Sequence, residues 1–92
     1  MSEIIFLVDG RSQPVPVDDA LEIRERLVER TLAADELRSA MSAAIRRAES
    51  GERPAIDVTE EMRGGLFKVL VAIKDDRGLT PALSELETTL LR

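Results

Sequence analysis

The chain has 92 residues, of which 43% are hydrophobic and 34% are charged, a composition typical of one small globular domain spanning residues 1–92. Its 18 acidic residues outnumber its 13 basic ones and give a net charge of -5, which disfavours binding to nucleic-acid phosphates and to anionic membranes. The sequence contains no cysteine and no histidine, which excludes disulfides, thiolate chemistry and the usual general base near neutral pH.

The first predicted element follows from the apolar run at 4–8, which ends in Asp9-Gly10. Such a run could end in a ligand-binding loop before a helix, or in a hairpin turn. A dinucleotide-binding loop needs several spaced glycines, whereas here only Gly10 is present and Pro14 and Pro16 follow it. Asp-Gly is favoured in type I′ turns because glycine adopts positive φ freely. The sequence therefore predicts a β-hairpin.

This turn fixes the register of the hairpin. It places both prolines at positions that form no ladder hydrogen bond, as expected for a strand at a sheet edge. The 4–8 run is apolar on both faces, so we expect it to be covered on both and to have a second neighbour, for which residues 55–58 are the candidate. The predicted hydrogen-bonded pairs are Val8 with Arg11, Phe6 with Gln13 and Ile4 with Val15.

Residues 18–50 have helical periodicity, and Asp18 or Asp19 can cap the start. The apolar positions change face between the first and second half of this segment, which predicts a break near Thr31 to Asp35. No glycine or proline marks the break, so one long helix over 18–50 is the alternative.

The remaining residues predict two further helices. Thr59 can cap the first of them, whose apolar stripe runs across Gly64-Gly65. Because the glycine pair disfavours a helix, residues 66–73 could instead form a strand; we favour the helix. Gly78 suits a helix C-terminus, and Thr80-Pro81 suits the start of a last helix. The predicted fold class is therefore α+β, with an N-terminal hairpin, possible pairing near 55–58, and three to four helices.

Few residues could support chemistry. The acidic pairs Asp18-Asp19, Glu60-Glu61 and Asp75-Asp76 are chain neighbours whose side chains diverge on a helix, so they are poor acid–base or metal sites. The first two pairs suit helix N-termini, whereas the third lies at a helix C-terminus, where the dipole disfavours acids. We therefore predict no enzyme activity and no catalytic, cofactor-binding or metal-binding residues.

Two functions remain open. The last two helices could form a helix-turn-helix of a transcriptional regulator or an antitoxin-type protein, but the last helix starts without Arg, Lys, Asn or Gln to contact bases. We favour a cytoplasmic protein-interaction module without a membrane span, a homodimer or a partner of another protein. Its interaction face would be the alanine-rich stripe of the second helix, for which an internal core is the competing interpretation. The stripe comprises Leu37, Ala40, Met41, Ala44, Ile45 and Ala48.

Overall fold

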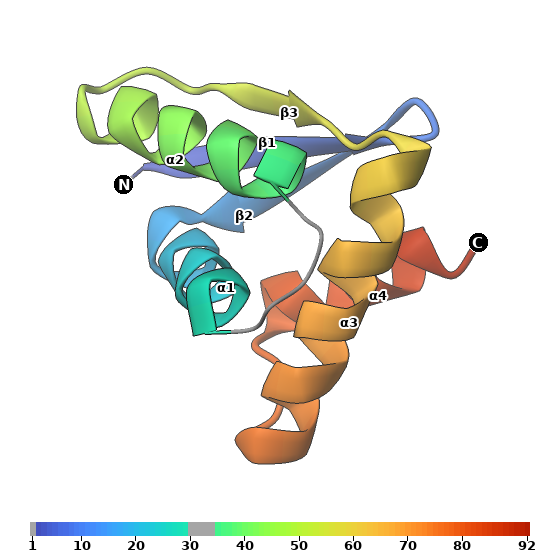
Figure 1. The fold of residues 1–92 in the computed structure, drawn as a ribbon. Helices are drawn as coiled ribbons and strands as arrows, with labels where there is room; N and C mark the ends of the chain where they lie inside the picture. Colours follow the sequence, from blue (N-terminus) through green and yellow to red (C-terminus); the bar gives the residue numbers. More distant parts are fainter. Residues whose placement is uncertain (1, 30–34) are drawn as a thin grey trace.

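The chain begins with the predicted hairpin, and helices follow it on either side of a third strand (Figure 1). The computed structural model describes residues 2–29 and 35–92. Within them, a three-stranded sheet of order β2-β1-β3 packs with four helices, which confirms the α+β class. The elements are β1 (Glu3–Val8), β2 (Arg11–Pro16), α1 (Val17–Glu29), α2 (Asp35–Glu49), β3 (Ala55–Asp57), α3 (Glu60–Asp76) and α4 (Pro81–Leu90).

The hairpin has the predicted register: Ile4 pairs with Val15, Phe6 with Gln13, and Val8 with Arg11. Its turn residues both have positive φ, 51° at Asp9 and 79° at Gly10, as a type I′ turn requires. The prolines face Ile5 and Glu3, where they interrupt no ladder bond, and β2 forms one edge of the sheet.

The third strand, β3, runs parallel to β1 on the side opposite β2. The Ile5 amide donates to the Pro54 carbonyl at 2.9 Å, and the Val58 amide donates to the Leu7 carbonyl at 2.9 Å. These bonds make β1 the central strand and leave β3 as the second edge.

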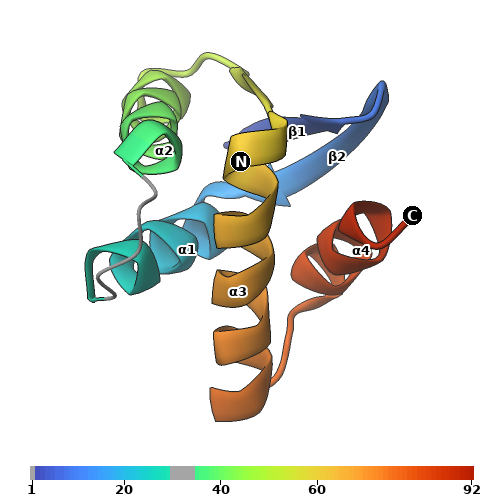
Figure 2. The same ribbon diagram turned by 45° about the vertical axis from the view of Figure 1, so that its right-hand side comes forward.

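All four helices lie on one side of the sheet (Figure 2). Ile4, Phe6 and Val8 face that side and are fully buried, whereas Ile5 and Leu7 face the other and are only half-buried. The expectation that β1 is covered on both faces was therefore wrong. The helices also pack on one another, since α3 contacts α1, α2 and α4, so their apolar stripes are buried without a second helical layer.

The segment 18–50 forms two helices rather than one. The predicted break near Thr31 to Asp35 falls largely on residues 30–34, which lie outside the described residues. Helix α1 begins at Val17, whose amide donates to the Ser2 carbonyl at 3.1 Å. Asp18 and Asp19 therefore lie within its first turn, where the helix dipole favours acids, and the prediction that one of them caps the helix was wrong.

Residues 66–73 are helical, within one uninterrupted α3. The Thr59 hydroxyl accepts from the Met62 amide at 3.3 Å and caps this helix, and Thr80 caps α4 in the same way. Gly78, with φ of 86°, ends α3 as predicted. Gly64 is exposed, and a Cβ added there would meet nothing within 4 Å, so no neighbouring element in the described chain requires this glycine.

Arg63 joins three distant parts of the chain. Its guanidinium lies 2.9 Å from the Asp9 carboxylate in the hairpin turn and donates to the Leu90 carbonyl at 2.8 Å. Its side chain is 20% exposed. Its contacts connect the hairpin turn and the end of α4 to the first turn of α3.

Candidate interaction surface

The six predicted interaction residues all lie on α2, and five of them are buried in the core of their own chain. Leu37, Met41, Ala44, Ile45 and Ala48 are at most 2% exposed and pack in one cluster with the sheet and the other helices. Ala40 is half-buried. A second chain could therefore contact most of this stripe only if α2 left the core. These five side chains therefore belong to the internal core, as the competing interpretation stated.

A cleft of about 230 Å³ lies between α2 and β3. Small side chains from α2 form one wall, and the sheet edge forms the other. Arg47 and Asp57 are its two charged residues. Two predicted interaction residues, Ala40 and Ala44, also line it, together with Ala43, which the sequence did not single out. The full lining is Ala40, Ala43, Ala44, Arg47, Pro54, Ala55, Ile56, Asp57 and Met62.

The edge of β3 borders this cleft. Ile56 lies opposite Phe6. Two positions before and after it, the Pro54 carbonyl accepts from the Ile5 amide and the Val58 amide donates to the Leu7 carbonyl. Because backbone groups alternate in direction along a strand, the amides and carbonyls of Ala55 and Asp57 point away from β1. Both residues are exposed. Such an edge is a template for pairing with another strand.

The charges along α2 are mostly exposed. Arg47 lies 3.1 Å from Glu52, with both side chains more than half exposed, and such surface pairs stabilise a fold by about 0 to 1 kcal/mol. Arg47 can therefore exchange its partner at small cost. Within residues 2–29 and 35–92, neither Glu36 nor Asp57 forms an ion pair.

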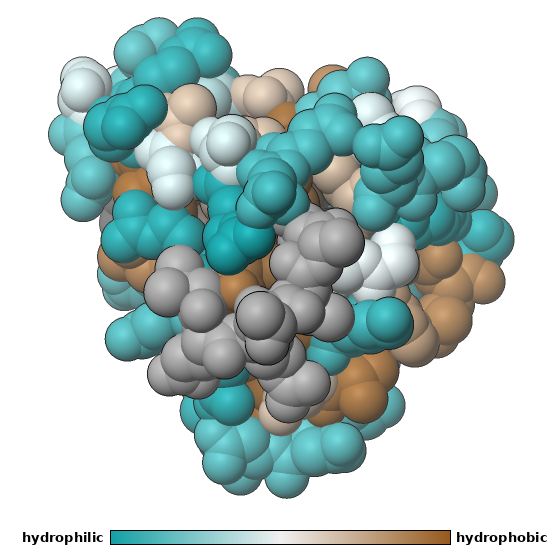
Figure 3. All heavy atoms as spheres, in the orientation of Figure 1, coloured by the Kyte–Doolittle hydropathy of each residue, from teal (hydrophilic) through white to brown (hydrophobic). Residues whose placement is uncertain are grey.

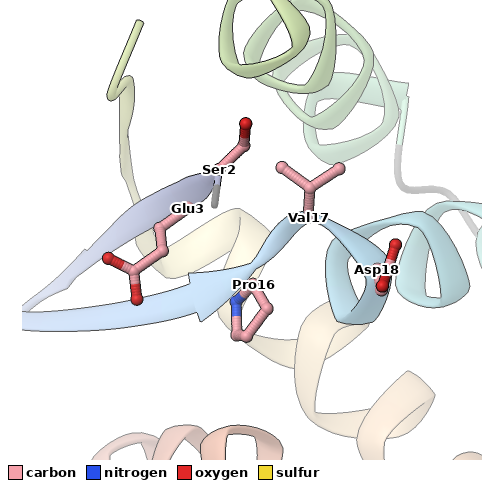
Figure 4. A pocket seen from close by; sticks show the side chains of 5 residues that line it. All are labelled: Ser2, Glu3, Pro16, Val17 and Asp18. Atoms are coloured by element: carbon pink, nitrogen blue, oxygen red, sulfur yellow. The ribbon is translucent and has the colours of Figure 1, made fainter. Parts of the chain in front are cut away.

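A second cleft, of about 320 Å³, lies where β1 and β2 meet α1 (Figure 4). Its lining includes two carboxylates, and Figure 4 shows Glu3 and Asp18 on opposite sides of Pro16. Glu3 already lies 3.1 Å from Arg53. The lining, which is completed by Ser2 and Val17, contains no histidine or lysine that could activate the Ser2 hydroxyl.

A third cleft, of about 370 Å³, lies between β2 and α4. Gln13 donates to Glu85 at 3.0 Å across it, and the hydroxyls of Thr88 and Thr89 donate to carbonyls of their own helix. These polar groups therefore already have partners within the chain. The lining is Gln13, Ser84, Glu85, Thr88, Thr89 and Arg92.

Except for Asp75, the residues of the acidic pairs have structural explanations. Asp18-Asp19 and Glu60-Glu61 lie in the first turns of α1 and α3. At the end of α3, Asp76 pairs with Arg26 of α1, and the neighbouring Arg77 Nε donates to Glu22 at 2.9 Å, whereas Asp75 is exposed and has no structural explanation. In the described part of the chain, no polar or charged side chain is buried, and no three acidic side chains converge as metal ligands.

The alternative nucleic-acid reading rests on α3 and α4. The exposed positions of α4 include Ser84, Glu85 and Thr88, and its last turn contains no basic residue. The side of the molecule in Figure 3 is mostly hydrophilic, with hydrophobic residues gathered at the lower right. Leu91, 67% exposed, is the one large hydrophobic residue that is exposed in the described chain. Helix α4 therefore has no basic side chain along its length, Pro81–Leu90.

Comparisons with protein families, with curated proteins and with solved structures found no match to this chain. Of the helices in the described residues, none is both long enough and apolar enough to cross a membrane.

Proposed function

We propose that this protein is a non-enzymatic interaction module that associates with a second copy of itself. The observation that supports this function is the open side of the sheet. One strand edge, β3, has outward backbone groups beside a cleft, and one whole sheet face bears the half-buried Ile5 and Leu7. Free edges and uncovered faces are the surfaces through which sheets recruit partners.

The chemistry of the chain supports a binding role over a catalytic one. The sequence has no histidine or cysteine. Within residues 2–29 and 35–92, neither Lys68 nor Lys74 forms a hydrogen bond with a hydroxyl, and Lys74 instead lies 3.4 Å from Glu87. A serine or threonine nucleophile would need an adjacent base.

A second copy is favoured as the partner because the surface near the cleft has both signs of charge, Arg47 on α2 and Asp57 on β3. A chain of net charge -5 repels its own copies at long range, so association requires such local complementarity. Closed twofold dimers are also the commonest soluble homo-oligomers.

Sedimentation equilibrium from low to high micromolar concentration tests the proposal. We expect the average mass to rise with concentration from 10.2 kDa towards twice that value. A chain that stays at 10.2 kDa at high micromolar concentration would contradict self-association.

A further inference from the structure

Four residues on one face of α2 form a stripe with two alanines at its centre and one charged residue at each end. Glu36, Ala40, Ala43 and Arg47 follow one another at intervals of four, three and four residues, the spacing that places side chains on one face of a helix. The two alanines are half-buried and the two charged residues are exposed. Three of the four, all except Glu36, line the cleft beside β3. We call these four residues the α2 stripe.

The α2 stripe is complementary to itself when it is reversed. In an antiparallel pair of α2 helices, the register that places Glu36 opposite Arg47 of the second copy also places Ala40 opposite Ala43. Twofold symmetry repeats both contacts. The acids in the first turn of α2 and the arginines in its last turn then face opposite charges along the whole pair, and the alanines at the centre permit close approach.

The free edge of β3 is compatible with the same symmetry. Helix α2 lies beside β3, and the chain reverses direction between them (Figure 1), so one twofold axis can make both elements antiparallel to their copies. A β3 pair centred on Ile56 would set Ala55 opposite Asp57 of the second copy. Their outward amides and carbonyls could then form hydrogen bonds across the axis.

We propose that two copies associate through antiparallel α2 stripes, with their β3 edges joined into one continuous sheet. This inference rests on the proposed self-association and specifies its surface. Stable interfaces bury about 1,200 to 2,000 Å² in total. A three-residue edge is far too small alone, so α2 must supply most of the contact. With one helix and one short strand from each copy, we expect a dissociation constant in the micromolar range.

Charge reversal tests the pairing. Glu36→Arg and Arg47→Glu each replace two attractive contacts by two repulsive ones, and we expect each to weaken the dimer about tenfold. Mixed in equal amounts, the two variants have opposite charges at every contact of the heterodimer, so the dimer mass should return. Arg46→Glu is the matched control, since it makes the same charge change in the same turn about 100° away from the stripe, and it should change the dissociation constant less than threefold.

Sedimentation of each variant and of the mixture distinguishes the outcomes, with circular dichroism to verify folding. Dimerisation by the mixture but not by either variant alone would support the interface, because a folding defect cannot be corrected by mixing. If the unmodified chain dimerises and Glu36→Arg dimerises equally well, or if the mixture stays monomeric, this interface is wrong while self-association stands. If the unmodified chain is monomeric at high micromolar concentration, both proposals fail.

Discussion

Two glycines of this chain should respond to substitution with opposite signs. At Gly10 and at Gly64, an added Cβ would meet nothing within 4 Å, so neither substitution creates a steric clash with a neighbour. They differ in the backbone: Gly10 has φ of 79° in the hairpin turn, whereas Gly64 lies inside α3. Holding an L-residue in the left-handed region costs about 1 to 2 kcal/mol, and a β-branched side chain resists it most.

We therefore expect Gly10→Val to lower the free energy of unfolding by about 1 to 2 kcal/mol. This corresponds to a fall in Tm of about 5 to 15 °C for a domain of this size. Gly64→Ala should raise the free energy of unfolding by about 0.5 to 1 kcal/mol, because alanine loses less backbone entropy in a helix. Gly10→Asn, which tolerates positive φ, should fall between Gly10→Val and the unmodified chain.

Thermal and urea denaturation, monitored by circular dichroism at one fixed protein concentration, measure all three variants. Fixed concentration matters because self-association would make Tm depend on it. An unchanged Tm for Gly10→Val would refute the type I′ hairpin. A destabilising Gly64→Ala would show that this glycine has a packing role that the described contacts do not explain.

Two further pairs of variants test the fold. Phe6→Ala should cost about 3 to 5 kcal/mol as a large core truncation, whereas Leu7→Ala, one residue along but half-buried on the outer face, should cost about 1 to 2 kcal/mol; equal losses in denaturation would mean that something covers the outer face. Arg63→Ala removes contacts to Asp9 and Leu90 from a side chain 20% exposed and should cost about 1 to 2 kcal/mol, whereas Arg53→Ala, 66% exposed and paired with Glu3, should cost less than about 0.5 kcal/mol; a loss for Arg53→Ala as large as that for Arg63→Ala would contradict this difference.

The local elements of the fold were predictable because a few residues strongly limit the backbone. Asp9-Gly10 selects the turn, and the turn sets the register in which both prolines avoid ladder bonds. Thr59 and Thr80 cap α3 and α4 because a hydroxyl at a helix start satisfies an otherwise free amide. These choices depend on neighbours in sequence, so no tertiary information was needed.

The open face of the sheet was not predictable from the same patterns. Because Ile5 and Leu7 are apolar, residues 4–8 have the pattern of a strand that is covered on both faces. The sequence alone does not indicate on which side of the sheet the helices pack. We expected the apolar stripe of α2 to form an interaction face, with an internal core as the competing interpretation. In the structure, the helices bury their stripes against one shared face and against each other, so Leu37, Met41 and Ile45 find internal partners.

The α2 stripe was missed because each of its members has a simpler explanation. Ala43 is one alanine in an alanine-rich helix, and Glu36 and Arg47 suit the positive and negative ends of the helix dipole. The dipole explanation and the dimer explanation are not exclusive, but they predict different measurements. Reversing either charge should weaken α2 by about 0.3 to 1 kcal/mol in the monomer through the dipole, and Arg46→Glu should do the same. If the two residues are in contact across a twofold axis, a separate chain that carries Arg47→Glu should restore dimerisation of the Glu36→Arg variant. A dipole acts within one helix, so its loss in one molecule cannot be corrected by another molecule.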